Sequence, residues 1–443
     1  MNEDLKQILT AIKDQGGEPY YAGGYVRDQI MGRESKDIDV EVYKTTLEQL
    51  EKVLSSFGVV DITGKTFAVL KLHHLNVDFS IPRKDNKVSA GHRGFNIESE
   101  PNLSFREACR RRDLTINSIL QDPFTLEYID PFEGVEDIKR KVLSAVDENT
   151  FLEDPLRALR VMQFISRLGF TPDDELKNLC IQADLSQLPG ERLFEEFKKL
   201  LLGQDPDKGL LWMSPGYTNL IKFFPELNAL WKCPQDPIHH AEGDVWTHTR
   251  LTVKEMKLLT NNVGLLFAAL LHDIGKPSCT SEDGKYHAYG HEEAGIEPAT
   301  KFLDRLCASN ELKEFVCVMI ESHMAPTLFY KKAKSSAYRR LARKLEKGKA
   351  TLLQLEQLAT ADHFGRASED SRLRIFKAGD DFLEKIKDLK VETKAITDIV
   401  MGRDLISRGF KAGIELGKIL AKCRNVQEEK GYTTVEEILK EVL

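Results

Sequence analysis

A glycine-rich turn followed by closely spaced aspartates, in residues 19–43 (PYYAGGYVRDQIMGRESKDIDVEVY), sets narrow limits on the fold. The pattern predicts a strand, a glycine turn, a short helix, a second turn and a second strand. In that second strand polar and apolar residues alternate, so Asp37, Asp39 and Glu41 share one face. Asp37 and Asp39 lie about 6.6 Å apart along the strand, and their oxygens suit a hard divalent cation such as Mg²⁺. An edge strand with a solvated acidic face is the alternative interpretation of this pair.

Two adjacent glycines, Gly23 and Gly24, open the predicted helix that carries Arg27 and Asp28. Glycines at this place allow backbone N–H groups to approach a triphosphate at the helix N-terminus, where the helix dipole favours negative charge. The stretch therefore combines a candidate metal site with a candidate phosphate site.

The succession Gly-Gly-x-Val-Arg-Asp, Gly-Arg and Asp-x-Asp resembles the head of the class II tRNA nucleotidyltransferases and bacterial poly(A) polymerases, members of the polymerase-β-like nucleotidyltransferase superfamily. This resemblance implies an α+β fold, with a small mixed sheet and helices in the head, followed by all-α neck, HD and tail domains. It implies that Asp37 and Asp39 are catalytic and bind two Mg²⁺ ions. It also implies nucleotide binding by the residues of the turn and helix: Gly23, Gly24, Arg27 and Asp28.

A further alternating strand, LNVDFSIPR, places Asp78 where it could join this pair as a third catalytic carboxylate. An ordinary polar strand position is the alternative for Asp78. Residues 84–104 then predict a long polar loop. In the resembled family this segment is a flexible loop needed for adding the final adenosine. It looks complete here, which favours an enzyme able to add A.

The segment FREACRRRDLTINSIL carries three consecutive arginines followed by acidic and hydrogen-bonding side chains. Such groups suit phosphate and sugar, although a basic, solvated helix end would look the same. R-R-D-x-T-x-N is a motif of the resembled family. The resemblance implies nucleotide binding by Arg112, Asp113 and Asn117.

Residues 151–170, FLEDPLRALRVMQFISRLGF, predict one helix on which Asp154, Arg157 and Arg160 share a face. Asp154 can only accept hydrogen bonds and Arg157 can only donate them. Together they match adenine and cytosine, each of which presents an amino group beside a ring-nitrogen acceptor. Uracil and guanine present the opposite order and leave groups unpaired. A surface Asp–Arg pair is the alternative.

This stretch resembles the family's E-D-x-x-R motif, in which protein side chains replace a nucleic-acid template. The resemblance implies that Asp154, Arg157 and Arg160 bind the nucleotide. Many members carry a third arginine where this chain has Gln163, so one inferred phosphate contact is missing.

The second half of the chain predicts helices that carry four candidate metal ligands: His248, His272, Asp273 and Asp362. Imidazoles and carboxylates from three helices suit a divalent metal. The set resembles the HD phosphohydrolase superfamily, which implies Mn²⁺, Ni²⁺ or Mg²⁺ activating water against a phosphate ester. His291 and His323 could add ligands for a second metal. A degenerate, purely structural HD domain is the alternative.

Four domains are expected in the 443 residues: a catalytic head (1–144), a helical neck with the base-reading helix (145–232), an HD-like domain (233–370) and a helical tail (371–443). The net charge of −7 argues against a uniformly basic nucleic-acid binder. The basic segment 331–350 is interpreted either as a solvated helix face or as a contact with the tRNA backbone.

The seven scattered cysteines and the polar N-terminus, without a signal peptide, predict a cytoplasmic protein with reduced thiols. No apolar run approaches the ~20 residues of a membrane span.

Taken together, these features predict a template-independent tRNA nucleotidyltransferase that builds or repairs the 3′-terminal CCA with CTP and ATP. It would recognise the tRNA 3′ end by shape and phosphates, with no DNA or membrane partner. The sequence leaves a monomer or a dimer open. The alternatives are an enzyme that adds only the terminal A, a poly(A) polymerase, a protein whose principal activity is HD phosphohydrolysis, and a non-enzymatic tRNA-binding protein.

Overall fold

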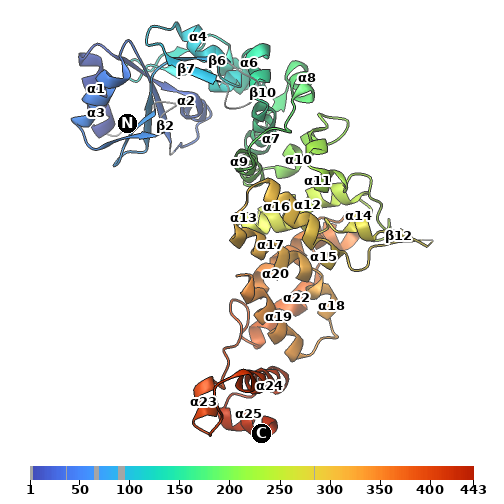
Figure 1. Ribbon diagram of the computed structural model, residues 1–443. Coiled ribbons are helices and arrows are strands. Elements are labelled where there is room, and N and C mark those ends of the chain that lie inside the picture. Colours follow the sequence, from blue (N-terminus) through green and yellow to red (C-terminus); the bar gives the residue numbers. More distant parts are fainter. Residues whose placement is uncertain (1–2, 36, 64–68, 88–94, 284) are drawn as a thin grey trace. The chain divides into compact units, whose positions relative to one another are not determined.

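The computed structural model describes residues 3–35, 37–63, 69–87, 95–283 and 285–443. The chain forms two compact units, Met1–Glu196 with Trp212–Leu220, and Phe197–Leu211 with Ile221–Leu443 (Figure 1). The four-domain division drawn from the sequence stays a prediction.

Among the described residues, the first unit is built on a seven-stranded mixed sheet with the order β3-β4-β5-β2-β1-β8-β9. β2 and β5 run parallel, whereas the other neighbouring strands are antiparallel. The strands are β1 (Glu18–Ala22), β2 (Ile38–Tyr43), β3 (Val60–Thr63), β4 (Val69–Leu72), β5 (Val77–Ser80), β8 (Leu120–Gln121) and β9 (Tyr128–Ile129). The parallel register sets Asp39 directly opposite Asp78, so the two aspartates lie side by side.

Apolar spacing and capping residues explain the helices around this sheet. α1 (Glu3–Asp14) buries four apolar side chains on one face, which gives the helix its apolar stripe. α3 (Leu47–Ser55) and α4 (Phe105–Arg110) both begin with capping boxes, at Thr46 and Ser104. Further helices up to residue 213 include α2 (Gly23–Ile30), η1 (Thr115–Asn117), α5 (Gly134–Arg140), α8 (Asp174–Gln182), α9 (Gly190–Leu201) and α10 (Pro206–Met213), of which α10 belongs mostly to the second unit. β10 (Val142–Leu143) pairs with β11 (Thr171–Pro172).

The long loop predicted over residues 84–104 is wrong for much of its length. β6 (Arg83–Lys87) and β7 (Phe95–Ser99) pair in an antiparallel ladder from Arg83↔Ser99 to Lys87↔Phe95. The polar composition of these residues gives no indication of the pairing, because the hydrogen bonds of a β-ladder join backbone groups whatever the side chains are. Residues 88–94 of the predicted loop lie outside the described residues.

The single helix predicted over 151–170 is also wrong, since the structure has two helices, α6 (Glu148–Glu153) and α7 (Leu156–Leu168). Asp154 lies at the break with extended backbone angles of φ −118° and ψ 97°. Pro155 disfavours helical geometry at the residue before it, which explains the break. The Asp154 carboxylate accepts the Leu156 N–H at 3.2 Å and so helps to begin α7.

In its described residues, the second unit is helical apart from a short hairpin formed by β12 (Ser281–Glu282) and β13 (Tyr286–His287). Its helices include η2 (Leu220–Phe223), α11 (Pro225–Asn228), α12 (Val245–Leu259), α13 (Val263–Leu271), α14 (Lys276–Cys279), α15 (His291–Ala294), α16 (Ile296–Arg305), α17 (Asn310–Ser322), α18 (Ala325–Phe329), α19 (Ser335–Lys347), α20 (Leu352–Phe364), α21 (Glu369–Arg372), α22 (Lys377–Asp388), α23 (Gly402–Ile406), α24 (Ile414–Lys430) and α25 (Val435–Val442). In the described part of the chain, no helix combines the length and apolar character needed to cross a bilayer.

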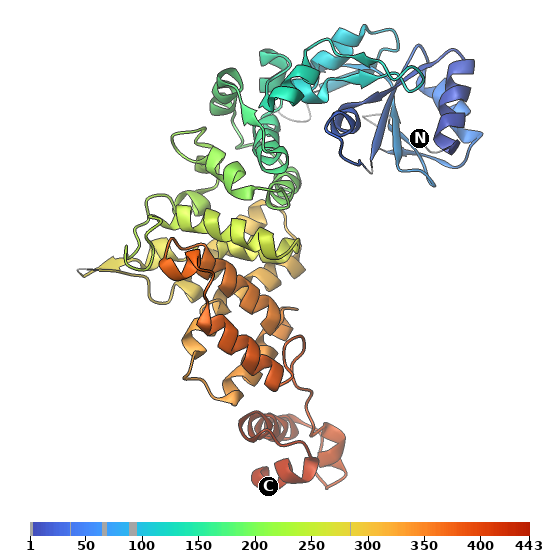
Figure 2. The same cartoon turned by 180° about the vertical axis from the view of Figure 1, so that it is seen from behind.

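An almost wholly apolar helix, α13, lies at the centre of this unit. Its residues 265–271 are all buried, as expected for a helix that is apolar on every side. α13 packs against α12, α17 and α20, and the yellow-to-orange helices lie together in both views (Figure 1, Figure 2). His272 directly follows α13, so the core of the unit positions the candidate metal ligands.

The basic side of α19 contacts the tail of the chain. Arg343 pairs with Asp398 at 2.8 Å and with Glu428 at 2.7 Å, and Glu428 is buried. Arg340 pairs with Glu429 at 2.7 Å, and Arg339 donates to the Glu428 carbonyl. These arginines hold α24, because carboxylates distant in the sequence compensate their charge. Arg340 is nonetheless exposed, and a contact of this segment with the tRNA backbone stays a prediction.

We expect Arg343→Ala to destabilise the protein by about 1–3 kcal/mol, because it leaves the buried Glu428 carboxylate without that partner. Lys344→Ala is the matched control, since the Lys344–Glu321 pair on the same helix is solvent-exposed and worth at most about 1 kcal/mol. Urea unfolding of both variants measures the difference. Equal losses would show that the arginine does not hold the tail.

Candidate functional site

Three carboxylates lie near the N-terminal ends of β2 and β5, two neighbouring central strands of the sheet in the first unit. Asp39 on β2 lies opposite Asp78 on β5, and Asp37 comes just before β2. The amide of Asn76 donates a hydrogen bond to Asp37 Oδ1 at 2.7 Å. Lys71 Nζ lies 2.8 Å from Asp78 Oδ1.

The charges of this carboxylate group oppose one another. Partial desolvation is the main cause that raises the pKa of Asp39, and the negative charges of Asp78 and Asp37 raise it further. The positive charge of Arg112 acts in the opposite direction. A divalent cation would remove this repulsion and would find only hard oxygen donors here, as Mg²⁺ prefers. The oxygen donors of the three aspartates suit magnesium, and the magnesium site itself stays a prediction.

Gly23 brings the backbone of α2 against these groups. Its φ of +65° is a left-handed conformation that favours glycine. A Cβ at this position would lie 2.9 Å from Arg112 Nη1 and 3.5 Å from Asp39 Oδ2. The first turn of α2 therefore packs closely against the guanidinium of Arg112 and the carboxylate of Asp39, groups that suit a phosphate and a metal ion.

Arg112 is anchored by Glu41, a residue to which the sequence assigned no function. Glu41 is 1% exposed, and its Oε2 lies 2.8 Å from Arg112 Nη2 and 3.2 Å from Arg111 Nη2. Tyr43 donates a hydrogen bond to Glu41 Oε1 at 2.8 Å. Burial alone would raise the pKa of Glu41, but the charges of Arg112 and Arg111 hold it below its ordinary value. The alternation on β2 indicated a shared acidic face, but only the fold shows that Glu41 is covered.

A chain of hydrogen bonds links the α2 residues to α7. Arg27 is 4% exposed and donates to Asp28 Oδ1 at 2.9 Å and to Asn117 Oδ1 at 2.7 Å. Asn117 donates to Asp113 Oδ1 at 2.9 Å, and Arg160 Nε donates to Asp113 Oδ2 at 2.6 Å. Although burial acts in the opposite direction, Arg160 and Asn117 hold the pKa of Asp113 well below its ordinary value. These five residues bond mainly to one another, and their binding of nucleotide stays a prediction.

The predicted base-reading residues are held by separate partners. Asp154 binds Arg192 of α9 through two hydrogen bonds, of 3.3 Å and 2.8 Å. Arg157 donates to the carbonyl oxygens of Arg111, Arg112 and Thr150 at 2.5, 3.4 and 2.8 Å. Asp154 and Arg157 thus do not share one helix face, because Asp154 precedes α7. Arg192 fixes the Asp154 carboxylate.

The position of the missing third arginine is buried. Gln163 is 1% exposed and accepts a hydrogen bond from Arg167 Nη1 at 3.1 Å. Arg27, Arg160 and Arg167 all lie over the ring of Phe164, at 5.3, 5.5 and 5.8 Å from its centroid. Gln163 therefore acts within this cationic group as an uncharged acceptor for Arg167.

In the second unit, the structure brings the four predicted HD residues together. His248 Nε2 lies 3.0 Å from Asp362 Oδ1 and 3.7 Å from Asp273 Oδ2. His272 Nε2 lies 3.2 Å from Asp273 Oδ2 and 3.3 Å from His248 Nε2. All four are buried. Three of them, His248, His272 and Asp273, form one of the groups of described residues that could hold a metal ion.

His291 and His323 face the other oxygen of the same aspartate. Their Nε2 atoms lie 3.3 and 3.9 Å from Asp273 Oδ1 and 3.2 Å from each other. Asp273 therefore lies between two groups of ligands and could bridge two metal ions.

The tautomers of these histidines favour metal binding. Nδ1 of His272, His291 and His323 lies 2.9, 2.7 and 2.6 Å from a backbone carbonyl oxygen, those of Ala269, Ala288 and Ile320. Each Nδ1 therefore carries the proton, and each Nε2 presents a lone pair toward the centre. Two lone pairs facing each other at 3.2 Å repel unless a cation lies between them or near them. This donor set fits a divalent transition metal.

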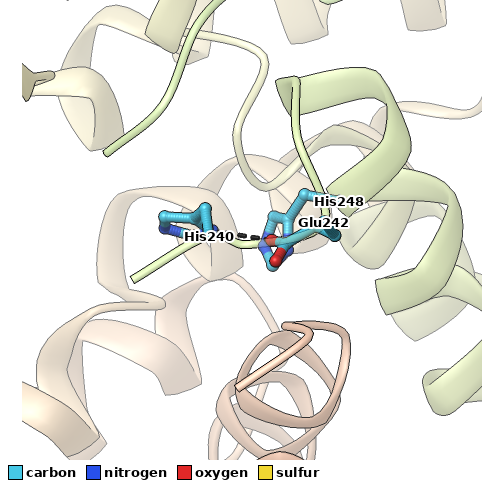
Figure 3. Close-up of side chains that lie close together, drawn as sticks. All are labelled: His240, Glu242 and His248. Carbon is cyan, nitrogen blue, oxygen red and sulfur yellow. Dashed lines mark hydrogen bonds and ion pairs between the residues drawn. The ribbon is translucent and has the colours of Figure 1, made fainter. Parts of the chain in front are cut away.

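His248 receives its orientation from Glu242, which the sequence did not single out. Glu242 Oε1 lies 2.9 Å from His248 Nδ1 and 2.8 Å from His240 Nδ1, and both rings turn toward the carboxylate (Figure 3). Burial lowers the pKa of His240 to about 4. Glu242 comes six residues before His248, a spacing that gives no periodic signal, so only the fold reveals the contact.

A cavity of about 470 Å³ opens onto this cluster and is lined by Asp273, His291 and Asp362. Lys276 Nζ lies 2.7 Å from Asp273 Oδ2, and Arg366 donates to both Asp362 oxygens at 3.1 and 2.9 Å. These two cations also line the cavity. Metal ligands beside a lysine and an arginine suit a phosphate group.

Three family models match the chain: the poly A polymerase head domain over residues 19–144, the probable RNA- and SrmB-binding site of polymerase A over 169–230, and the HD domain over 245–367. The chain is 35% identical over 316 residues to the multifunctional CCA protein of Mannheimia succiniciproducens, covering 68% of this chain and 73% of that protein. It is 33% identical over 312 residues to the multifunctional CCA protein of Shewanella frigidimarina, covering 69% and 73%. The chain belongs to the multifunctional CCA protein family.

Solved structures support the fold of this CCA protein family member. The Bacillus stearothermophilus CCA-adding enzyme in complex with CTP aligns with a TM-score of 0.66 at 19% identity, covering 100% of this chain and 98% of that one. The Thermotoga maritima CCA-adding enzyme complexed with tRNA aligns with a TM-score of 0.60 at 20% identity, covering 100% and 95%. The predicted α+β fold class and the family resemblance are confirmed.

We expect Glu41→Gln to destabilise the protein by about 3 kcal/mol at pH 7, because Arg112 stays buried without its counter-charge. The pKa of Glu41 is lower in the folded state than in the unfolded state. Ionised Glu41 therefore makes its full contribution to the free energy of unfolding above about pH 4.3, the ordinary glutamate pKa. This contribution is lost as the pH falls further, so the difference between variant and wild type should shrink in acid. Chemical unfolding at several pH values measures this, with the exposed Glu127→Gln as control. A pH-independent difference would contradict the ion-pair account.

We expect Glu242→Gln to weaken Mn²⁺ binding by about 10- to 100-fold, because His248 loses the carboxylate that orients its ring. Isothermal titration calorimetry of the full chain measures the affinity. Glu282→Gln, on the exposed strand β12, is the control and should bind as the wild type does. Unchanged affinity in Glu242→Gln would show that Glu242 does not position the ligand.

Proposed function

We propose that this chain adds and repairs the 3′-terminal CCA of tRNA without a nucleic-acid template, using CTP and ATP. The observation that carries the proposal is the placement of Asp39 and Asp78 side by side next to Gly23 and Arg112. Membership of the multifunctional CCA protein family supports it. Structural neighbours are described in complex with CTP, with ATP and with tRNA.

The carboxylates Asp37, Asp39 and Asp78 would hold Mg²⁺ in this reaction. When bound, two such ions would activate the tRNA 3′-hydroxyl and neutralise the leaving pyrophosphate. The 3′ oxygen forms a bond to the α-phosphorus, the bond between that phosphorus and the α,β-bridging oxygen breaks, and pyrophosphate leaves. Gly23 and Gly24 let the triphosphate approach the first turn of α2, and Arg112, held by Glu41, faces the same space.

Asp154 and Arg157 would select the base. Three of the five N–H groups of Arg157 are taken by backbone carbonyls, so its guanidinium is fixed before a nucleotide arrives. Asp154 is fixed in the same way by Arg192. Preorganised groups lose little entropy on binding and discriminate strongly against bases with the opposite hydrogen-bond order. The hydrogen-bonded chain between α2 and α7 would then position the groups that bind the triphosphate relative to the groups that bind the base. Its members are Arg27, Asp28, Asp113, Asn117 and Arg160.

We further propose that the HD region is a metal-dependent phosphohydrolase acting on small nucleotides. The observation that favours it is the bridging position of Asp273 between two groups of histidines, with Lys276 and Arg366 beside them. Mn²⁺, Ni²⁺ or Mg²⁺ bound there would supply a hydroxide for attack on a phosphate ester. Lys276 and Arg366 would orient the phosphate by charge-assisted hydrogen bonds.

A test of the first proposal offers the purified chain three tRNA transcripts, ending at the discriminator base, at C and at CC. We expect all three to grow to CCA with CTP and ATP and no further, and UTP and GTP to be refused. Asp39→Ala should lower incorporation at least 10³-fold, because the reaction loses a metal ligand. Incorporation of ATP only on the CC-ended transcript would mean an A-adding enzyme, and long adenosine tails would mean a poly(A) polymerase.

The two proposed activities should separate by mutation, since their residues lie on different compact units. We expect His272→Ala to abolish phosphohydrolysis and leave CCA addition intact, and Asp39→Ala to do the reverse. Rates of both reactions on both variants measure this. Loss of both activities in either variant would contradict independent sites.

A further inference from the structure

An exposed tyrosine stacked on a half-buried histidine borders the HD cavity. Tyr289 is 82% exposed, and its ring stacks on His287 with centroids 5.2 Å apart and an interplanar angle of 11°. Both residues line the same cavity as Asp273 and His291. A tyrosine this exposed keeps most of its ring surface open to solvent, where a ligand in the cavity could contact it.

The backbone fixes this pair relative to the metal ligands. His287 belongs to β13 and pairs with Ser281 of β12, in the hairpin that projects from the helices (Figure 1). Its Nε2 lies 3.3 Å from Asp283 Oδ1. Tyr289 is followed by Gly290, whose φ of +76° is left-handed, and then by His291, which begins α15. A metal-ligand candidate and the aromatic pair are therefore joined by a single glycine turn.

The cavity thus has two chemically different parts. One part carries the cluster of histidines and carboxylates with Lys276 and Arg366, which suits a phosphate. The other part offers a flat aromatic surface, which suits a planar ring. Its volume of about 470 Å³ lies in the range of small-molecule sites. A ligand that combines a phosphate with a planar ring fits both parts at once.

We propose that Tyr289, supported by His287, is a stacking platform for the base of a nucleotide whose phosphate lies at the HD cluster. This inference rests on the proposed phosphohydrolase function and deepens it by naming the residue that binds the base. Stacking depends on the face of a ring, which every base has, so the platform accepts different bases. The site is therefore selective for nucleotides over phosphate esters without a ring system, and tolerant among the bases.

The test uses the full chain with Mn²⁺ and two kinds of substrate. Uridine and guanosine monophosphates carry bases that the head is expected to refuse, and ribose 5-phosphate carries no base. Tyr289→Ala should lower kcat/KM for both nucleotides about 5- to 150-fold, mainly through KM, and leave ribose 5-phosphate hydrolysis unchanged. Tyr289→Phe keeps the ring face and should stay within about 2-fold of the wild type. Tyr128→Ala, an exposed tyrosine on β9, is the matched control and should change nothing.

Binding of uridine monophosphate, measured by calorimetry, gives a second readout that does not need turnover. Its affinity should fall by a similar factor in Tyr289→Ala and be retained in Tyr289→Phe. Equal losses on nucleotides and on ribose 5-phosphate, or no loss on either, would overturn the platform while leaving the phosphohydrolase proposal in place. If the wild type hydrolyses none of these esters, the phosphohydrolase proposal fails. The calorimetric comparison then decides the platform, since equal nucleotide binding by wild type and Tyr289→Ala would overturn it.

Discussion

The buried ion pair between Glu41 and Arg112 underlies the geometry of the head. Arg112 would otherwise be a flexible surface cation, but the covered carboxylate of Glu41 holds its guanidinium beside Gly23 and Asp39. Burying two charges costs free energy, which is recovered only when the pair is well bonded, and here Tyr43 and Arg111 complete the bonding. The result is a fixed positive charge next to a set of carboxylates, the arrangement that a metal-bound triphosphate needs.

The backbone of Arg111 and Arg112 links the phosphate side of the site to the base side. The carbonyl oxygens of Arg111 and Arg112 accept hydrogen bonds from Arg157, so the backbone of one motif orients the arginine that we propose to read the base. In parallel, Asp113 joins Asn117 to Arg160. A network of this kind leaves few alternative arrangements, because each member that moved would leave a buried polar group unpaired. Template-independent selection of a base requires such rigidity, since no second strand aligns the nucleotide.

In the HD cluster, too, hydrogen bonds to buried groups fix the orientation of the functional side chains. Its histidines present lone pairs to a common centre only because their other nitrogens are fixed, by backbone carbonyls for His272, His291 and His323 and by Glu242 for His248. The all-apolar helix α13 sets His272 and Asp273 at its end, and α12 and α20 pack against it carrying His248 and Asp362. The core of this unit thus determines the ligand geometry.

The sequence by itself determined the family, the fold class and most candidate site residues, because glycine turns, carboxylate spacings and apolar periodicities are local patterns with local physical causes. It did not yield the break at Asp154, where the restriction imposed by Pro155 outweighs the helical pattern. It also did not yield the β6–β7 ladder, the covering of Glu41, the contact of Glu242 with His248 or the docking of α24 on Arg343. Each of these depends on contacts between residues that are distant in the sequence. Burial then determines whether a charged side chain needs a partner of opposite charge. Only the tertiary structure decided whether an acidic or basic side chain faces water, a metal or a buried partner.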